Sequence, residues 1–162
     1  MSVRFRPATP DDLDALAELE ARSYPADEAA SRETIAFRLQ QAPACFLAAV
    51  DDEALVGFVC GTRARGASLT HASMSEHVPD GESLCIHSVV VEASRRRTGL
   101  GSRLLRAYLE HARASVPGAV RALLICKQHL TGFYGAAGFE LAGPSQVVHG
   151  QDPWFEMVQP LT

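Results

Sequence analysis

Apolar and polar positions in the first part of the chain predict one short strand and two amphipathic helices. Val3-Arg4-Phe5-Arg6 has the period of two that is typical of a strand. Thr9-Pro10-Asp11 predicts a helix start, because proline suits the first turn and acids suit its positive end. Residues 24–28 end this helix, and Ser31 is the expected cap of the second. The expected apolar faces are Leu13, Leu16, Ala17 and Leu19-Glu20 in the first helix, and Ile35, Phe37 and Leu39 in the second.

The middle of the chain has the pattern of strands. Residues 45–50 and 55–62 predict a hairpin around the turn Asp51-Asp52-Glu53. Residues 63–82 predict a polar, irregular connection. The β-branched run Ile86-His87-Ser88-Val89-Val90-Val91 then predicts a buried strand.

A long amphipathic helix follows Gly99, and further strands follow the helix. Residues 122–126 form a second apolar run, and residues 154–158 predict a final strand. The order β-α-α-β-β-β-α-β-α-β-β predicts one mixed α/β domain over residues 1–162, with helices flanking a mixed sheet of six or seven strands. The apolar positions of the long helix are Leu100, Leu104, Leu105, Tyr108, Leu109 and Ala112.

The turn before this helix has the composition of a phosphate-binding loop. Arg96-Arg97-Thr98-Gly99-Leu100-Gly101-Ser102 joins a strand to a helix start, where unpaired backbone N–H groups and the helix dipole favour an anion. The dinucleotide fingerprint is excluded, because Leu104 stands where its third glycine belongs. A triphosphate loop is excluded, because the single lysine, Lys127, does not follow a glycine.

Two motifs together carry a resemblance to a known enzyme superfamily. The pattern Arg-x-x-Gly-x-Gly resembles the acetyl-CoA pyrophosphate loop of the GCN5-related N-acetyltransferase (GNAT) superfamily. The run Phe133-Tyr134 with Gly138-Phe139, after a buried strand, resembles its second signature. Residues 85–91, 124–126 and 142–157 are most similar to the arylalkylamine (serotonin) N-acetyltransferase family, and in particular to its microbial branch. The resemblance implies a GNAT fold and an acetyl-CoA:amine N-acetyltransferase, and the lack of a signal-length or membrane-length apolar run in residues 1–162 predicts a cytoplasmic location.

The resemblance also implies roles for individual residues. His87 matches a catalytic base, although from the residues alone it equally suits a hydrogen-bonded core histidine. Tyr134 matches a general acid beside the CoA sulfur, a role that a phenol suits because it is protonated at neutral pH; from the residues alone it equally suits a helix tyrosine packed in the core beside Phe133 and Phe139. The family pattern has a second histidine where this chain has Cys85, which implies that His87 works alone or through water. Implied acetyl-CoA contacts are Val89 to the thioester carbonyl, Val90 and Val91 to the pantetheine, and Arg97, Thr98, Gly99, Leu100, Gly101 and Ser102 to the pyrophosphate.

The expected acceptor is a small amine, whose exact class the sequence leaves open. The resemblance places Tyr24, Ile125, His149 and Trp154 around an aromatic ring. Asp27, Glu28 and Asp152 are near these positions and would also suit a polyamine. A protein N-terminal acetyltransferase and a non-catalytic acyl-CoA sensor are further alternatives, although a sensor needs neither His87 nor Tyr134.

Charge and composition limit the other classes of partner. The net charge of −4 divides into −6 for residues 1–81 (seven basic, thirteen acidic) and +2 for residues 82–162 (eight basic, six acidic). This division suits an anionic cosubstrate and a cationic acceptor, and no basic, aromatic-rich face indicates nucleic acid. The longest apolar run, residues 44–50, is far below the roughly 20 residues that span a bilayer. The four cysteines lack metal-ligand spacing, so we expect free thiols and no metal; the oligomeric state is not indicated.

Overall fold

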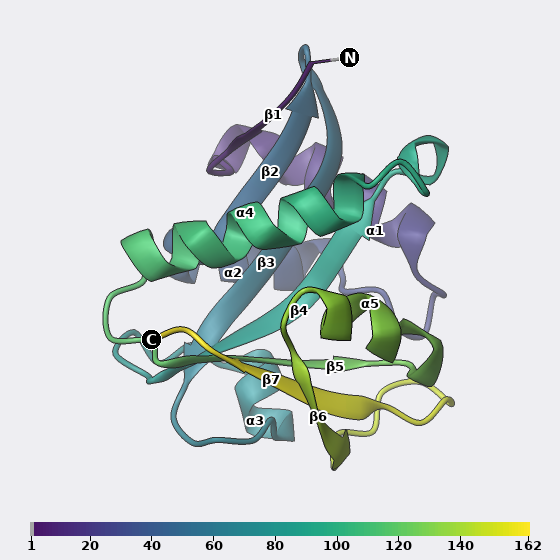
Figure 1. Cartoon of the computed structure of the whole chain (residues 1–162). Coiled ribbons are helices and arrows are strands. Elements are labelled where there is room, and N and C mark those ends of the chain that lie inside the picture. The colour runs from purple at the N-terminus through teal and green to yellow at the C-terminus, as the bar shows by residue number, and fades with distance from the viewer. Residues whose placement is uncertain (1) are drawn as a thin grey trace.

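The computed structural model describes residues 2–162 and is built on a seven-stranded sheet with the order β1-β2-β3-β4-β5-β7-β6 (Figure 1). The strands β4 and β5 are parallel, and the other neighbouring pairs are antiparallel. The mixed α/β fold expected from the sequence is therefore confirmed. The strands are β1 (Val3–Arg6), β2 (Phe46–Asp51), β3 (Ala54–Ala64), β4 (Ser83–Val91), β5 (Arg121–Cys126), β6 (Glu140–Pro144) and β7 (Phe155–Pro160).

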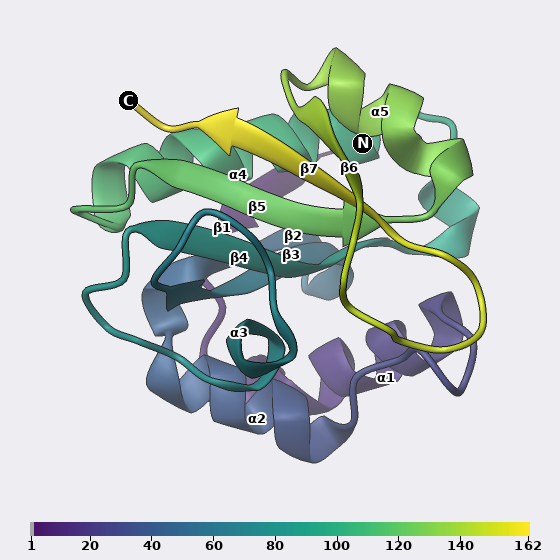
Figure 2. The ribbon, with the colours of Figure 1, turned by 90° about the horizontal axis from the view of Figure 1, so that it is seen from below.

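Helices cover both faces of the sheet (Figures 1 and 2). The long helix α4 and the short helix α5 lie on one face, and α1 and α2 lie on the other. Within residues 2–162, no helix is both long and apolar enough to cross a bilayer. The helices are α1 (Leu13–Ser23), α2 (Arg32–Gln41), α3 (His71–Ser75), α4 (Leu100–Ser115) and α5 (Thr131–Ala136), with 3-10 turns at Pro10–Asp12, Pro43–Cys45, Ala93–Arg95 and Gln128–Leu130.

Helix α4 buries the face that its spacing predicts. All six of its expected apolar positions are buried, and they pack with residues of β2, β3, β4 and β5 in one core cluster. Burial of a leucine side chain contributes about 1.5–3 kcal/mol, so this stripe fixes the helix across the sheet. This packing also holds the start of α4 near the end of β4, which precedes it in the chain.

The opposite face has a smaller core between the sheet and α1 and α2. Leu16, Leu19, Ile35 and Leu39 pack there against residues of β2 and β3. The expectation for Phe37 was wrong, because its side chain is 42% exposed. A residue two positions after Ile35 is about 200° around the helix from it, so both cannot face the same core.

Strands β4 and β5 pair only over the first part of their length. Ser83 through Ile86 pair with Arg121 through Leu124, whereas β4 continues to Val91 along β3. Beyond Ile86, the side of β4 that faces away from β3 has no neighbouring strand in residues 2–162. This separation exposes strand-like backbone groups in the middle of the sheet.

The expected irregular connection at residues 63–82 was partly wrong. Strand β3 continues to Ala64, Leu69 is buried, and α3 lies within this segment. A capping box between Thr70 and Ser73 starts α3, which is too short to produce a helical period in the sequence. Smaller differences are Cys45, which lies in a 3-10 turn before β2, and the final strand, which begins one residue later than expected.

Candidate active site

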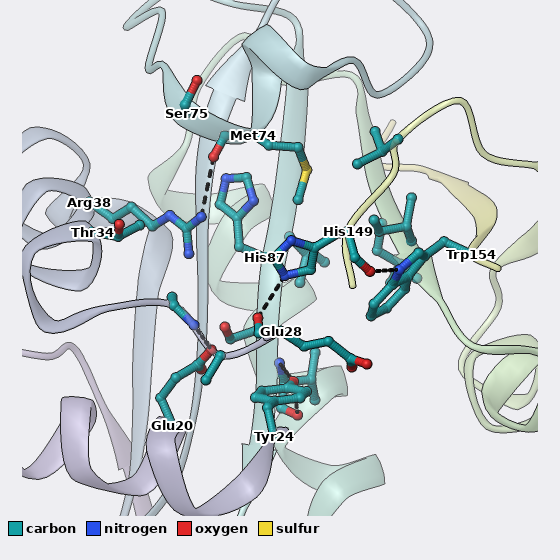
Figure 3. Close-up of a pocket in the computed structure, with 18 of the residues that line it drawn as sticks. Glu20, Tyr24, Glu28, Thr34, Arg38, Met74, Ser75, His87, His149 and Trp154 are labelled. Atoms are coloured by element: carbon teal, nitrogen blue, oxygen red, sulfur yellow. Dashed lines mark hydrogen bonds between the residues drawn. The ribbon is translucent and has the colours of Figure 1, made fainter. Parts of the chain in front are cut away.

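A cavity of about 530 Å³ lies between the sheet and helices α1 and α2, beside the point where β4 and β5 separate (Figure 3). A volume of this size suits a small molecule. Its walls come from segments that are far apart in the sequence: the end of α1, α2, β4, the end of β5, and the loop between β6 and β7. All four residues expected around the acceptor line it, together with both expected catalytic residues: Tyr24, Ile125, His149, Trp154, His87 and Tyr134.

His87 enters this cavity because of an irregularity in β4. Cys60 pairs with Ser88 while the next residue of β3, Gly61, pairs with Ile86, so His87 is the extra residue of a bulge. Such a bulge changes the direction of a side chain and is common beside active sites. The Nε2 atom of His87 is 2.7 Å from the Thr62 hydroxyl, and its buried Nδ1 atom has no hydrogen-bond partner in residues 2–162.

The environment keeps the His87 ring neutral. Burial, and to a smaller extent the positive charge of Arg38, lowers the pKa of His87 well below its usual 6.5. At neutral pH the ring therefore carries one proton. If that proton is on Nε2, it is donated to the Thr62 hydroxyl, and Nδ1 remains free to accept another.

Tyr134 lies on α5 and is held between two other aromatic rings. Phe133 and Phe139 contact its ring edge to face, with centroids 5.0 and 5.9 Å away. Burial, with a smaller effect of Cys126, raises the pKa of the Tyr134 phenol above its usual value of 10. The phenol therefore stays protonated, as a proton donor must.

The Tyr24 hydroxyl forms hydrogen bonds to β4 on the side of the strand that β5 leaves unpaired. The hydroxyl donates to the Val89 carbonyl at 3.2 Å and accepts from the Val89 N–H at 3.4 Å. The Val91 carbonyl accepts from Arg96 Nε at 3.3 Å, on the same side of the strand. Because backbone groups alternate along an antiparallel strand, those of Val90 face β3, so the backbone pairing with a cosubstrate falls to Val89 and Val91, and a contact of Val90 stays a prediction.

The turn before α4 has the conformation of an anion-binding loop. Arg97 and Gly99 both have positive φ angles, of 63° and 83°. Hydrogen bonding within the helix begins with Arg103 N–H to the Gly99 carbonyl, which leaves the amides of Leu100, Gly101 and Ser102 directed out of the helix start. The glycine turn predicted from the sequence is confirmed. The left-handed conformation of Arg97, which the sequence did not predict, is part of the same turn.

Hydrogen bonds and ion pairs attach the loop between β6 and β7 to other segments beside the cavity. His149 Nε2 lies 2.7 Å from the Glu28 carbonyl, and the Trp154 indole donates to the His149 carbonyl at 2.5 Å. Lys127 forms ion pairs with Glu28 (2.8 Å) and Asp152 (3.0 Å). The His149–Glu28 hydrogen bond, which Figure 3 shows, and the Lys127 ion pairs join the loop to the segment between α1 and α2, whereas the Trp154–His149 hydrogen bond lies within the loop.

Four polar residues and one methionine of the cavity were missed by the sequence reasoning. Glu20, Arg38, Thr62, Met74 and Ser88 all line it. Glu20 had a visible signal, because it is an acid on the apolar face of a helix. The others had none, since the bulge and the packing of α2 bring them to the cavity.

Cys85 lies outside the cavity lining and packs with Leu123 and Val147. Burial raises the pKa of its thiol to about 12, so it stays protonated at neutral pH. The hydrogen-bond partner of His87 is instead Thr62, from the neighbouring strand.

The geometry defines a class of protein: an α/β fold with a separated parallel strand pair, a helix start that suits phosphate, and a neutral buried histidine. The family model for the acetyltransferase (GNAT) family matches residues 13–139, and the chain belongs to this family. The chain is 31% identical to serotonin N-acetyltransferase of Mesocricetus auratus, over 94% of this chain and 75% of the relative. The enzyme from Macaca mulatta is 29% identical, over 94% and 76%.

Solved structures share the same fold. The GphF GNAT-like decarboxylase in complex with isobutyryl-CoA has a TM-score of 0.84 and 26% identity, and the match covers 98% of this chain and 100% of that chain. The ribosomal-protein-S18-alanine N-acetyltransferase from Escherichia coli has a TM-score of 0.73 at 17% identity, over 99% and 95%. Together with the curated relatives, these similarities identify the chain as an N-acetyltransferase of the GNAT superfamily.

Proposed function

We propose that this enzyme transfers the acetyl group of acetyl-CoA to the primary amine of a small arylalkylamine, by direct attack when both substrates are bound. The observation that carries the proposal is the neutral His87 ring, whose unpartnered Nδ1 lies at a cavity with aromatic walls. The relatives named serotonin N-acetyltransferase support the acceptor class.

Two features of the chain suit acetyl-CoA. The free side of β4 at Val89 and Val91 can pair with an extended pantetheine arm, as an added strand would. The left-handed turn at Arg97 and Gly99 directs the first amides of α4 toward the place of a pyrophosphate. The start of α4 follows β4 in the chain, so one cosubstrate can reach both.

The proposed reaction assigns one proton to each of the two catalytic residues. The amine nitrogen attacks the thioester carbon, and the proton it loses moves to His87 Nδ1. The Val89 N–H stabilises the oxyanion that forms on the carbonyl oxygen. When the carbon–sulfur bond breaks, the thiolate of CoA takes the phenol proton of Tyr134, whose raised pKa favours its return to the protonated form.

The charges around the cavity favour an arylalkylamine over a polyamine. Glu28 and Asp152, which were candidates for attracting a polycation, both form ion pairs with Lys127. The Lys127 ammonium also lies 5.8 Å from the centre of the Trp154 ring. Lys127 compensates one of these two carboxylate charges, so Glu28 and Asp152 offer a second or third ammonium less charge than two free acids would, whereas Tyr24, Trp154 and Ile125 offer apolar surface.

The tied loop argues against a protein N-terminal acetyltransferase. A peptide acceptor needs an open groove, but the His149–Glu28 hydrogen bond joins the loop between β6 and β7 to the segment between α1 and α2, and both segments line the cavity. A short amine with one aromatic ring needs no such groove.

A thiol-release assay with acetyl-CoA tests the proposal. Tryptamine, phenylethylamine, spermidine and a short peptide serve as acceptors, and mass spectrometry identifies the products. We expect release of CoA and an N-acetyl product with the two arylalkylamines, and much slower release with spermidine and the peptide. A preference for spermidine or the peptide would overturn the acceptor class, and turnover of none of the four would overturn the proposed function. A parallel incubation with malonyl-CoA tests for decarboxylation, which releases CO2 and leaves acetyl-CoA, without release of free CoA.

A further inference from the structure

The cavity contains a concentration of polar atoms that have no hydrogen-bond partner. Five buried side-chain atoms in residues 2–162 lack one, and four of them belong to residues that line this cavity. Buried polar groups in folded proteins are almost always satisfied, so such a concentration needs an explanation. The four atoms are Glu20 Oε1, Glu28 Oε1, His87 Nδ1 and Ser88 Oγ.

The chemistry of these atoms is biased toward accepting hydrogen bonds. A carboxylate oxygen only accepts, and Nδ1 of the neutral His87 accepts when Nε2 holds the ring proton. The Ser88 hydroxyl can accept or donate. A ligand group with several donors and no acceptor complements such a set, and a primary ammonium, with three N–H donors, is that group.

Glu20 differs from Glu28 in how its charge is compensated. Glu28 is in direct contact with Lys127, whereas Glu20 makes no ion pair within 4 Å in the described chain. Oε2 of Glu20 accepts from the Ala30 N–H at 2.9 Å, which fixes the carboxylate while Oε1 remains unpartnered. The side chain is only 2% exposed, so water does not compensate its charge either.

The surroundings of Glu20 act on its ionisation in both directions. Burial has the largest effect and raises the pKa of Glu20, and the hydrogen bond from the Ala30 N–H and the positive charge of Arg38 oppose it in part. Arg38 is itself positioned by a hydrogen bond to the Met74 carbonyl at 3.2 Å. Figure 3 shows Glu20 and Arg38 on the same side of the cavity, with His87 beside them.

We propose that Glu20 is the acceptor-specificity residue of this enzyme: its Oε1, with Ser88 Oγ and His87 Nδ1, holds the substrate as a primary ammonium ion. This inference rests on the proposed function and adds to it how the enzyme selects a cationic acceptor over a neutral one. The amine arrives in its charged form and is oriented by Glu20 and Ser88. It loses a first proton to His87 Nδ1, which passes that proton to solvent; the neutral amine then attacks the thioester carbon, and Nδ1 takes the second proton. Neither Glu20 nor Ser88 takes part in acetyl-CoA binding under this proposal.

Paired ligands that differ only in charge test the proposal. Tryptamine carries the ammonium, and tryptophol has the same ring and chain with a neutral hydroxyl. Their dissociation constants are measured by calorimetry, with and without saturating CoA, for the unaltered protein and for Glu20→Gln. The amide of glutamine can still accept from Ala30 N–H, so the loop contact is retained. Glu33→Gln is the matched control, because it removes an exposed carboxylate that lines the same cavity.

We expect Glu20→Gln to reduce the preference for tryptamine over tryptophol by roughly 10- to 100-fold, the range for a hydrogen bond to a charged group. The Glu33→Gln variant should leave the preference unchanged. Ser88→Ala should reduce it by about two- to tenfold, and this variant decides the question if Glu20→Gln does not fold.

The outcomes separate this inference from the proposed function. An equal loss of affinity for both ligands in Glu20→Gln would show a structural role and overturn the inference, even if acetyl transfer to arylalkylamines is observed. An unchanged preference in both variants would overturn it as well. Binding of tryptamine with the expected preference but without any turnover would overturn the proposed function alone.

Discussion

The Tyr24 hydroxyl occupies the stretch of β4 where we expect the thioester of acetyl-CoA to bind. It uses both backbone groups of Val89, at 3.2 Å and 3.4 Å, on the side of the strand that β5 leaves free. These two hydrogen bonds must break before the Val89 N–H can meet a thioester carbonyl. Removal of the hydroxyl in Tyr24→Phe should therefore strengthen acetyl-CoA binding.

The magnitude follows from the length of the two bonds. A net hydrogen bond contributes about 0.5–1.5 kcal/mol, and both distances are longer than the usual 2.7–3.0 Å, so about 0.5 kcal/mol each is appropriate. The sum of about 1 kcal/mol corresponds to a roughly fivefold lower dissociation constant for acetyl-CoA. Val89 lies at the cavity, where water can take over its backbone groups in the free variant.

Calorimetric titration of acetyl-CoA into both proteins measures this effect. Tyr108→Phe is the control, because the Tyr108 hydroxyl bonds the Cys45 carbonyl at 2.9 Å within the core and does not line the cavity. The control should lower the free energy of unfolding and leave acetyl-CoA affinity unchanged. Unchanged or weaker acetyl-CoA binding by Tyr24→Phe would refute the assignment of this part of β4 to the thioester.

Three further substitutions test the remaining roles. Tyr134→Phe should lower kcat by roughly 10- to 10,000-fold without changing the acetyl-CoA dissociation constant, because only the proton donor is lost; steady-state kinetics with calorimetry would contradict this if kcat stayed at the unaltered value. Cys85→Ala should leave kcat nearly unchanged, because its protonated thiol lies outside the cavity, and a loss as large as that of a catalytic variant would show that the proton path is wrong. Gly99→Val should weaken acetyl-CoA binding, because a φ of 83° is strained for a β-branched residue. Gly101→Ala should have a smaller effect, because an added Cβ would meet Phe133 at an ordinary 3.4 Å. If calorimetry gave the two variants the same affinity for acetyl-CoA, that result would contradict the phosphate-loop assignment.

The order of the strands and long helices could be predicted because each has a strong local pattern. The apolar stripe of α4 and the β-branched run of β4 are both repeated over several residues. The short helix α3 has no such repetition, and its start depends on one capping box. Local patterns therefore gave the framework of the fold but not its shortest element.

The candidate site was predictable only where a motif names its residues. His87 and Tyr134 come from motifs, but the bulge that directs His87 into the cavity depends on the pairing register of β3 and β4. The same register brings Thr62 next to His87, although the two residues are 25 positions apart in the sequence. The lone acid Glu20 on an apolar helix face was the one further signal that the sequence contained.

The pH dependence of kcat with tryptamine and saturating acetyl-CoA tests the central claim that His87 is the base of an acetyltransferase. A base must be deprotonated, and burial lowers the pKa of His87, so its active form persists below pH 6.5. We expect kcat to stay level as the pH falls to 6.5 and to decline only at lower pH. In His87→Gln, kcat should lose most of its value, and that acidic limb should disappear. An acidic limb that remains in a folded His87→Gln enzyme with undiminished kcat would show that the base is another group.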